Sequence, residues 1–178
     1  MGLALVLGHL AAALWPKRVQ ELAAEACASA RWGQLLMTID FVWIVLLLWD
    51  APINPLRMEL FDFTFARGFL LLACPVVWYT LCLHAKQNLF GRALGLFLLL
   101  LGIVPLTAAY LKEPETRVLI PLWWYPVLTV AILWVPMPYL LRDWVAWLGG
   151  RPRLIRGLAL AGLVYGAAVL ACALLFWT

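Results

Sequence analysis

Residues 93–111 read ALGLFLLLLGIVPLTAAYL, a run without an ionisable side chain other than Tyr110. A bilayer core of about 30 Å is crossed by about 20 residues of α-helix, at about 1.5 Å of rise per residue. This run is therefore predicted to be a transmembrane helix. Four further runs have comparable length and apolarity and are predicted to span the membrane as well: residues 32–49, 68–85, 118–141 and 157–178.

The composition of the whole chain is that of a membrane protein. Its 178 residues are 66% hydrophobic and 12% charged, against about 45–50% and about 25% in ordinary soluble domains. This balance excludes a water-soluble globule, and it is the opposite of the balance in disordered chains. We expect an all-α, polytopic membrane helix bundle that forms one integral membrane domain over residues 1–178.

Two shorter helices are predicted before the first long span. Residues 1–15 are apolar, but about 21 Å of helix falls short of a bilayer, so this segment either crosses with local thinning or enters partway. Pro16 ends or kinks it. Residues 16–31 carry alanines and other apolar residues on one helical face and charged residues on the rest. That pattern is typical of an amphipathic helix lying at the membrane interface.

Basic residues are distributed unevenly over the loops. Counting residues 1–15 as the first of six helices, the odd-numbered loops carry nine Lys or Arg and the even-numbered loops carry four. Lys and Arg concentrate on the cytoplasmic side of membrane proteins, so we expect the odd loops inside and the carboxyl terminus outside, in a bacterial inner membrane. The amino terminus is outside too if the first helix crosses completely. The basic residues are scattered singly, which argues against a nucleic-acid partner.

Asp40 is the strongest candidate for a functional side chain. It lies eight residues into the run 32–49, roughly 12 Å deep, where an unpaired carboxyl group is expected to be neutral. His9 reaches a similar depth if its helix crosses antiparallel. The pair is interpreted as a proton relay, or as a carboxylate orienting a histidine that ligates haem or chlorophyll magnesium. The alternative is an Asp40 bonded to a carbonyl or hydroxyl group and a packed His9.

Two further polar side chains lie near the ends of predicted spans. His84, near the inner end of residues 68–85, is either a cofactor ligand or a histidine among lipid headgroups. It is not expected to form a bis-histidine haem site with His9, because the two lie at different depths. Arg67, at the outer end of the same run, either contacts an anionic substrate or snorkels and pairs with Asp62 or a lipid phosphate.

Prolines and glycines indicate where helices bend and pack. Residues 118–141 contain four prolines near the two ends; such prolines either free carbonyl groups for ion binding or merely start and end the helix. Close packing of helices, within the chain or on a partner, is favoured by small residues at four-residue spacing. Such spacing occurs at three places: Gly8/Ala12, Gly91/Gly95 and Gly162/Gly166.

Groups for catalysis are sparse. Ser29 is the single serine, and the chain contains neither HExxH nor a phosphate-binding glycine loop. The four cysteines form no CxxC and are expected to be reduced, small apolar residues without a metal: Cys27, Cys74, Cys82 and Cys172.

These features favour a non-catalytic role. We hypothesise a subunit or assembly factor of a larger membrane complex, respiratory or photosynthetic, whose helices contact lipid, quinone, haem or a chlorophyll-type pigment. Its partners would be the lipid bilayer and other membrane subunits or further copies of itself. One alternative is a small-solute or proton-coupled transporter that uses Asp40 and His9. Another is a membrane enzyme that acts on a lipid through Asp50, Asp62 and Arg67.

Overall fold

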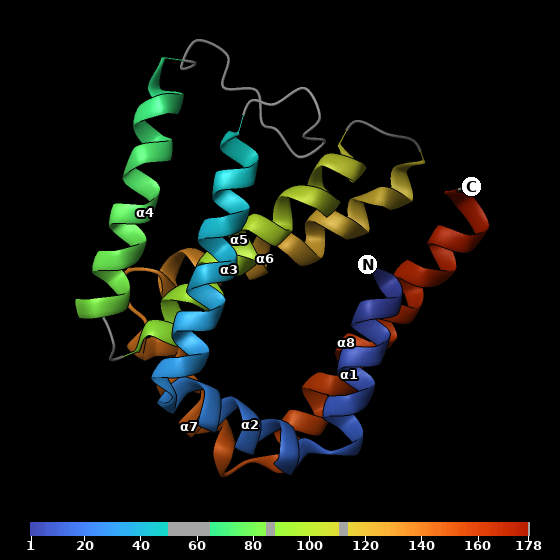
Figure 1. Cartoon of the computed structure of the whole chain (residues 1–178). Coiled ribbons are helices and arrows are strands. Elements are labelled where there is room, and N and C mark those ends of the chain that lie inside the picture. Colours follow the sequence, from blue (N-terminus) through green and yellow to red (C-terminus); the bar gives the residue numbers. More distant parts are fainter. Residues whose placement is uncertain (50–64, 85–87, 111–113, 178) are drawn as a thin grey trace.

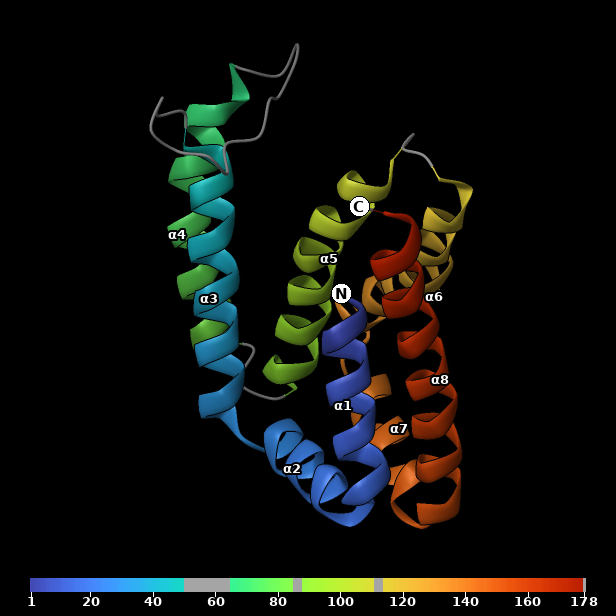
Figure 2. The same cartoon turned by 90° about the vertical axis from the view of Figure 1, so that its right-hand side faces the viewer.

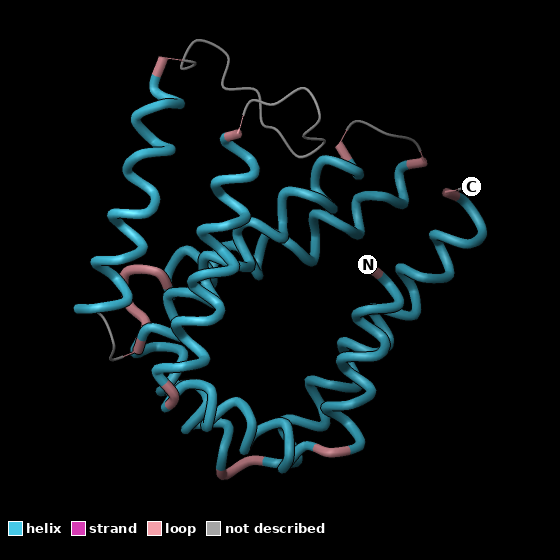
Figure 3. Tube along the Cα trace, viewed as in Figure 1, coloured by secondary structure: helices cyan, strands magenta, loops and turns pink. Residues whose placement is uncertain are grey.

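The computed structural model describes residues 1–49, 65–84, 88–110 and 114–177. Almost all of these residues are helical (Figure 3). The elements in chain order are α1 (Gly2–Leu14), α2 (Pro16–Ala28), α3 (Ala30–Leu48), α4 (Ala66–His84), α5 (Leu89–Ala109), the 3-10 helix η2 (Glu115–Val118), α6 (Leu119–Trp134), α7 (Tyr139–Gly149) and α8 (Pro152–Phe176).

Five helical segments of the described chain are long and apolar enough to cross a membrane. They are Ala30–Leu48, Ala66–His84, Leu89–Ala109, Glu115–Trp134 and Pro152–Phe176. The predictions of five long apolar helices and of an all-α membrane helix bundle are thereby confirmed. The chain is an integral membrane protein, with α1 as an additional, shorter apolar helix.

The helices form two groups (Figure 1), and Figure 2 shows α2 at their shared base. In the first group α3 packs against α4 and α5, and α5 packs against α6. The second group is the pair α1 and α8. Helices α2 and α7 contact each other and connect the two groups at one end of the molecule, which we call the basal end. The opposite, distal end is where α3, α5 and α8 finish.

The basal end carries most of the basic residues of the described chain. They lie in α2, at the starts of α3, α5 and α8, and in and after α7: Lys17, Arg18, Arg31, Arg92, Arg142, Arg151, Arg153 and Arg156. At the distal end stand Arg67 of α4 and Arg117 of η2. The odd-numbered loops of the sequence analysis thus meet at one end of the bundle.

The helix predicted over residues 118–141 ends earlier than expected. α6 stops at Trp134, and Tyr139 starts a separate helix, α7, most of which lies in the loop predicted after residue 141. Pro136 and Pro138 cause this break, because neither has an N–H group to continue the helical hydrogen bonds. α7 is amphipathic: Leu141 is buried, while a neighbouring Arg–Asp pair on the same helix is exposed.

Other boundaries shift by two to five residues. The predicted interfacial helix 16–31 ends at Ala28, because Ser29 has an extended backbone (φ −89°, ψ 117°) that separates α2 from α3. α5 begins at Leu89 after Asn88, whose φ of 60° is left-handed. α8 begins at Pro152, where a proline is tolerated because the first N–H groups of a helix have no helical partner.

Glycines of α8 bring it into backbone contact with α1. A Cβ atom at Gly166 would lie 2.9 Å from Leu5 Cβ and 3.0 Å from Val6 N, and one at Gly162 would overlap the His9 ring. Gly2 lies against Leu170, six residues before the end of α8. Since six residues of helix measure about 9 Å, α1 stops short of the distal end and follows only part of its partner.

Two apolar clusters fill the larger group of helices. One lies between α3, α4 and α5 around Met37, Cys82 and Ala93. The other lies between α5 and α6 around Ile120 and Trp124, with Trp177 packed against it. α5 and α6 approach closely at Gly95, because this residue has no Cβ atom. A Cβ there would lie only 2.8 Å from the carbonyl oxygen of Ala131. The predicted small-residue pairs of α5 and α8 therefore act inside the chain, whereas Gly8 faces open space.

Candidate functional site

A large cavity lies between the two groups of helices, towards the distal end. Its volume is about 950 Å³, near the top of the range of about 300–1,000 Å³ for small-molecule sites. Its walls come from the first turn of α1, the distal halves of α5 and α8, and the first half of α6. Residues on these walls include Leu5, Leu98, Leu101, Val104, Pro105, Arg117, Trp123, Trp124, Val127, Leu170, Ala173 and Trp177.

Three aromatic rings connect the helix groups below the cavity. The Trp123 ring of α6 stacks on Tyr165 of α8, with centroids 5.3 Å apart, and meets His9 of α1 edge-on at 5.5 Å. The Tyr165 hydroxyl group donates a hydrogen bond of 2.5 Å to the carbonyl oxygen of Leu119. These side-chain contacts connect α6 to the α1–α8 pair, although the helix backbones themselves are not in close contact there.

A second connection closes the distal end. The Trp177 indole N–H donates to Thr116 Oγ1 at 2.9 Å, and the Arg117 guanidinium lies 5.7 Å from the centre of the Trp177 ring. Arg117 Nη1 also donates to the carbonyl oxygen of Ala108 at 3.4 Å. The cavity is therefore bounded by aromatic rings at middle depth and by a cation at its rim.

The cavity wall is apolar with a few polar groups. Arg117 Nε and Trp124 Nε1 are buried donors without a hydrogen-bond partner in the described chain, a situation that costs about 1–3 kcal/mol per group. Pro105 has no N–H group, so the carbonyl group of Leu101 one turn earlier loses its usual helical donor. A ligand with an oxygen-bearing polar head and an apolar tail would fit such a cavity.

Asp40 is buried elsewhere, on α3. Its side chain is 0% exposed, and neither carboxylate oxygen has a hydrogen-bond partner among the described residues. One turn before it, Met37 packs against α5; three residues after it, Trp43 meets the ring of Phe97 on α5 at 6.1 Å. Asp40 therefore faces a helix interface and remains a candidate for a proton-binding group.

His9 and Asp40 are not brought together. α1 packs on α8, whereas α3 packs on α4 and α5. His9 Nδ1 is 2.8 Å from the carbonyl oxygen of Leu5, one turn earlier on the same helix. The Nε2 edge of the ring lies on Gly162, which leaves no room beside it for a haem or chlorophyll macrocycle. The His9 ring packs between helices, as in the alternative interpretation of this residue.

His84 and Arg67 lie at opposite ends of α4. His84 is the last residue of the helix; its exposed ring contacts the carbonyl oxygen of Thr80 at 3.1 Å through Nδ1. Arg67, the second residue, is half-buried. The carboxylates that the lipid-enzyme hypothesis places beside it, Asp50 and Asp62, fall outside the described residues.

The cysteines and prolines form no reactive centre in the described chain. All four cysteines are free thiols. No three side chains of His, Cys, Asp or Glu in this part of the chain gather at a place that could hold a metal ion. In α6 only Pro126 lies beyond the first turn, and Pro136 and Pro138 follow the helix rather than interrupting it.

Sequence reasoning missed the residues that shape the cavity. Trp123 lies near the end of an apolar run, where tryptophans are common in any membrane protein, and Arg117 lies in a loop, so neither residue stands out in the sequence. One signal was present: Arg117 directly precedes a span that has two adjacent tryptophans, Trp123 and Trp124, in its second turn. Comparison with protein-family models, with curated proteins and with solved structures finds no match for this chain.

Proposed function

We propose that this chain is a non-catalytic membrane subunit or accessory factor that holds one amphipathic molecule, a lipid or a quinone with an apolar tail, in the cavity between its two helix groups. The observation that carries this proposal is the cavity itself: about 950 Å³, apolar along its length, with Arg117 at the rim.

The polar groups of the wall suggest the chemistry of the head. Arg117 lines the cavity and its side chain is partly exposed, so a head with acceptor oxygens, such as a carbonyl, carboxylate or phosphate group, would pair with its guanidinium group. The tail would lie along Leu98, Leu101 and Leu170. Neither histidine lines this cavity, so the site offers no histidine ligand to haem or to a chlorophyll-type pigment.

Docking on a larger complex is the second part of the proposal. α4 packs mainly against α3, and none of its 18-residue hydrophobic window is buried inside the chain. Lipid tails or a neighbouring subunit would cover this face. Co-purification of a fixed partner with the full-length chain, and its loss when α4 residues such as Val76 become bulky, would support the subunit role over a solitary lipid-binding protein.

Filling the cavity should displace its occupant. Ala173 of α8 lines the cavity, and Ala173→Phe places a ring inside it. We expect the amount of lipid or quinone that co-purifies with the protein, measured by mass spectrometry of an organic extract, to fall about tenfold, corresponding to about 1.4 kcal/mol of binding free energy.

The control substitution is Ala171→Phe. It makes the same change two residues earlier on α8, where the side chain is exposed, and should leave the bound lipid unchanged. Arg117→Gln tests the head: it should reduce binding of acidic or carbonyl-bearing molecules and spare purely apolar ones. Equal lipid content in Ala173→Phe and Ala171→Phe protein would contradict the proposal.

Proton-coupled transport is a second candidate function. The observation that favours it is Asp40, a fully buried carboxyl group without a partner in the described chain. An ionisable side chain inside a membrane is by default a candidate for an ion or proton pathway. His9 is not available as its partner, so this function would rest on Asp40 alone.

The membrane orientation is also part of the proposal: the basal end faces the cytoplasm of a bacterial inner membrane, because its cations follow the positive-inside rule. In a variant without native cysteines, Arg151→Cys should be protected from an impermeant maleimide in intact cells, whereas Glu115→Cys should react. The native Cys27 thiol is a poor reporter, because burial raises its pKa and lowers its thiolate fraction. The reverse labelling pattern would invert the orientation.

A further inference from the structure

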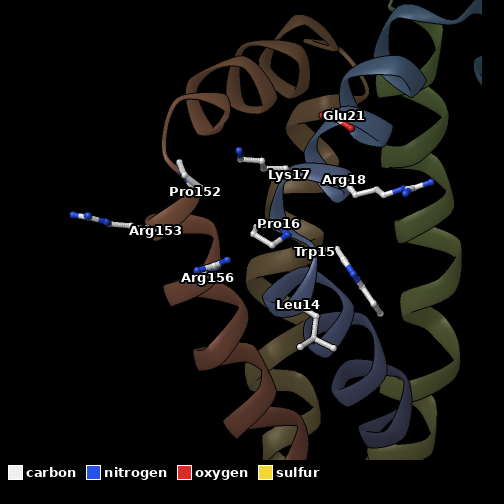
Figure 4. A pocket seen from close by; sticks show the side chains of 9 residues that line it. All are labelled: Leu14, Trp15, Pro16, Lys17, Arg18, Glu21, Pro152, Arg153 and Arg156. Atoms are coloured by element: carbon white, nitrogen blue, oxygen red, sulfur yellow. The ribbon is translucent and has the colours of Figure 1, made fainter.

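A second cleft lies at the basal end, where the joint between α1 and α2 meets the start of α8 (Figure 4). Its volume is about 540 Å³. Four cations, Lys17, Arg18, Arg153 and Arg156, and one carboxylate, Glu21, line it. The local charge is therefore +3, from four positive groups and one negative group.

These five charged groups have no ion-pair partner among the described residues. In the described parts of the chain, none of them takes part in a salt bridge or a side-chain hydrogen bond. By contrast, Arg142 of α7, at the same end, pairs with Asp143 at 3.4 Å. The cleft thus gathers four cations and one carboxylate without ion pairs between them, whereas Arg142 has a carboxylate partner.

Helix dipoles add to this charge. α2 and α8 both begin with a proline and have no acidic residue in their first turns. Helix amino termini carry about half a positive charge, and a cation there is unfavourable by typically 0.3–1 kcal/mol. Cations at two adjacent helix amino termini therefore do not serve helix stability. Together with the helix dipoles, these cations favour the binding of an anion from outside the protein.

Apolar surface continues directly from the cations. Trp15 and Leu14, which line the same cleft, are 60% and 56% exposed. Leu154 and Leu158, on the first turns of α8, are exposed as well. The cleft therefore combines a cationic rim with an apolar surface that points into the bilayer. A freely dissolved phosphate would use only the rim, whereas a phospholipid would use both.

We infer that this cleft binds the headgroup of an anionic phospholipid at the basal surface of the membrane, with the acyl chains along Leu14 and Trp15. Basic pockets between membrane helices bind such headgroups, at about 1 kcal/mol per Lys or Arg near the surface. In Figure 4 Arg153 and Arg18 extend to opposite sides while Arg156 lies beside Pro16. The cations therefore do not converge on one oxygen, and their wide spacing suits a broad headgroup.

The test measures lipid binding to the purified full-length protein in detergent. Native mass spectrometry follows its titration with phosphatidylglycerol and with phosphatidylcholine of identical acyl chains. The double variant Arg153→Gln/Arg156→Gln should bind phosphatidylglycerol at least about tenfold more weakly. The control Arg31→Gln/Arg142→Gln removes the same charge from the same end outside the cleft, and should change binding little. Thermal unfolding of both variants confirms that each is folded.

Three outcomes would overturn the inference. Equal binding of both lipids by the unmodified protein would mean that charge does not select the occupant. An equal loss in both double variants would mean that the whole basal surface attracts anionic lipid without a site. Displacement of phosphatidylglycerol by millimolar inorganic phosphate would assign the cleft to a soluble anion. Because the cleft and the distal cavity share no lining residue, Ala173→Phe should leave this binding intact.

Discussion

Replacing Gly162 with leucine is expected to lower the melting temperature of the detergent-solubilised protein by roughly 10 °C. Overpacking a tight contact costs typically 1–3 kcal/mol, and each kcal/mol shifts the melting temperature by about 2–4 °C in a chain of this size. Gly162 is at the severe end, because even a Cβ atom would overlap the His9 ring. α1 would have to move off α8, and the edge-on contact of Trp123 with His9 and its stacked contact with Tyr165 would be disturbed.

Gly157→Leu is the matched control on the same helix. Nothing lies within 4 Å of a Cβ atom at Gly157, so leucine there should be neutral or slightly stabilising, given its helix propensity advantage of about 0.8 kcal/mol over glycine. Scanning fluorimetry compares the two variants. Similar melting temperatures would show that α1 does not pack on α8 through Gly162, and would remove one wall of the proposed cavity.

Replacing Asp40 with leucine is expected to raise the melting temperature by about 5 °C while abolishing any function that needs the carboxyl group. A buried polar group without a partner costs about 1–3 kcal/mol. Leucine branches at the same atom and brings no unpaired oxygen. Asp40→Asn keeps an unpaired polar group and should leave the stability nearly unchanged.

Function and stability are then measured in parallel. If the chain moves protons, flux in liposomes should disappear in both Asp40→Asn and Asp40→Leu, although the second protein is more stable. Asp143→Leu, on the exposed face of α7, is the control and should change the melting temperature by less than about 2 °C. A destabilised Asp40→Leu protein would show that the carboxyl group makes a stabilising contact. Unchanged flux would exclude the proton pathway.

The membrane spans were predictable because each is set by a local requirement. A helix in hydrocarbon must be apolar along its whole length. Residues 93–111 meet this requirement, and it can be recognised without knowing which helices pack against them. α7 was less visible. Its charged residues resemble a loop between two spans, and only the Pro136–Pro138 joint separates it from α6.

The candidate site was much less predictable. Depth along a helix follows from counting residues, so Asp40 and His9 could be placed at similar levels. Which helices are neighbours depends on how all of them pack around each other, and residue counts contain no such information. Gly162 and Gly166 allow α1 to pack closely on α8, away from α3. His9 and Asp40, which lie at similar depths, are therefore not brought together.

The amino acids alone establish that this chain is a membrane bundle, where its spans run and at which end its cations gather, since apolarity and charge act on each segment separately. Packing decides the rest. The cavity exists because α1 and α8 pair through glycines while α5 and α6 pair through Gly95, so that space is left between the two pairs. Trp123 crosses this space in the middle of the bundle and Trp177 crosses it at the distal end. Such a space is a property of four helices at once, and no single segment encodes it.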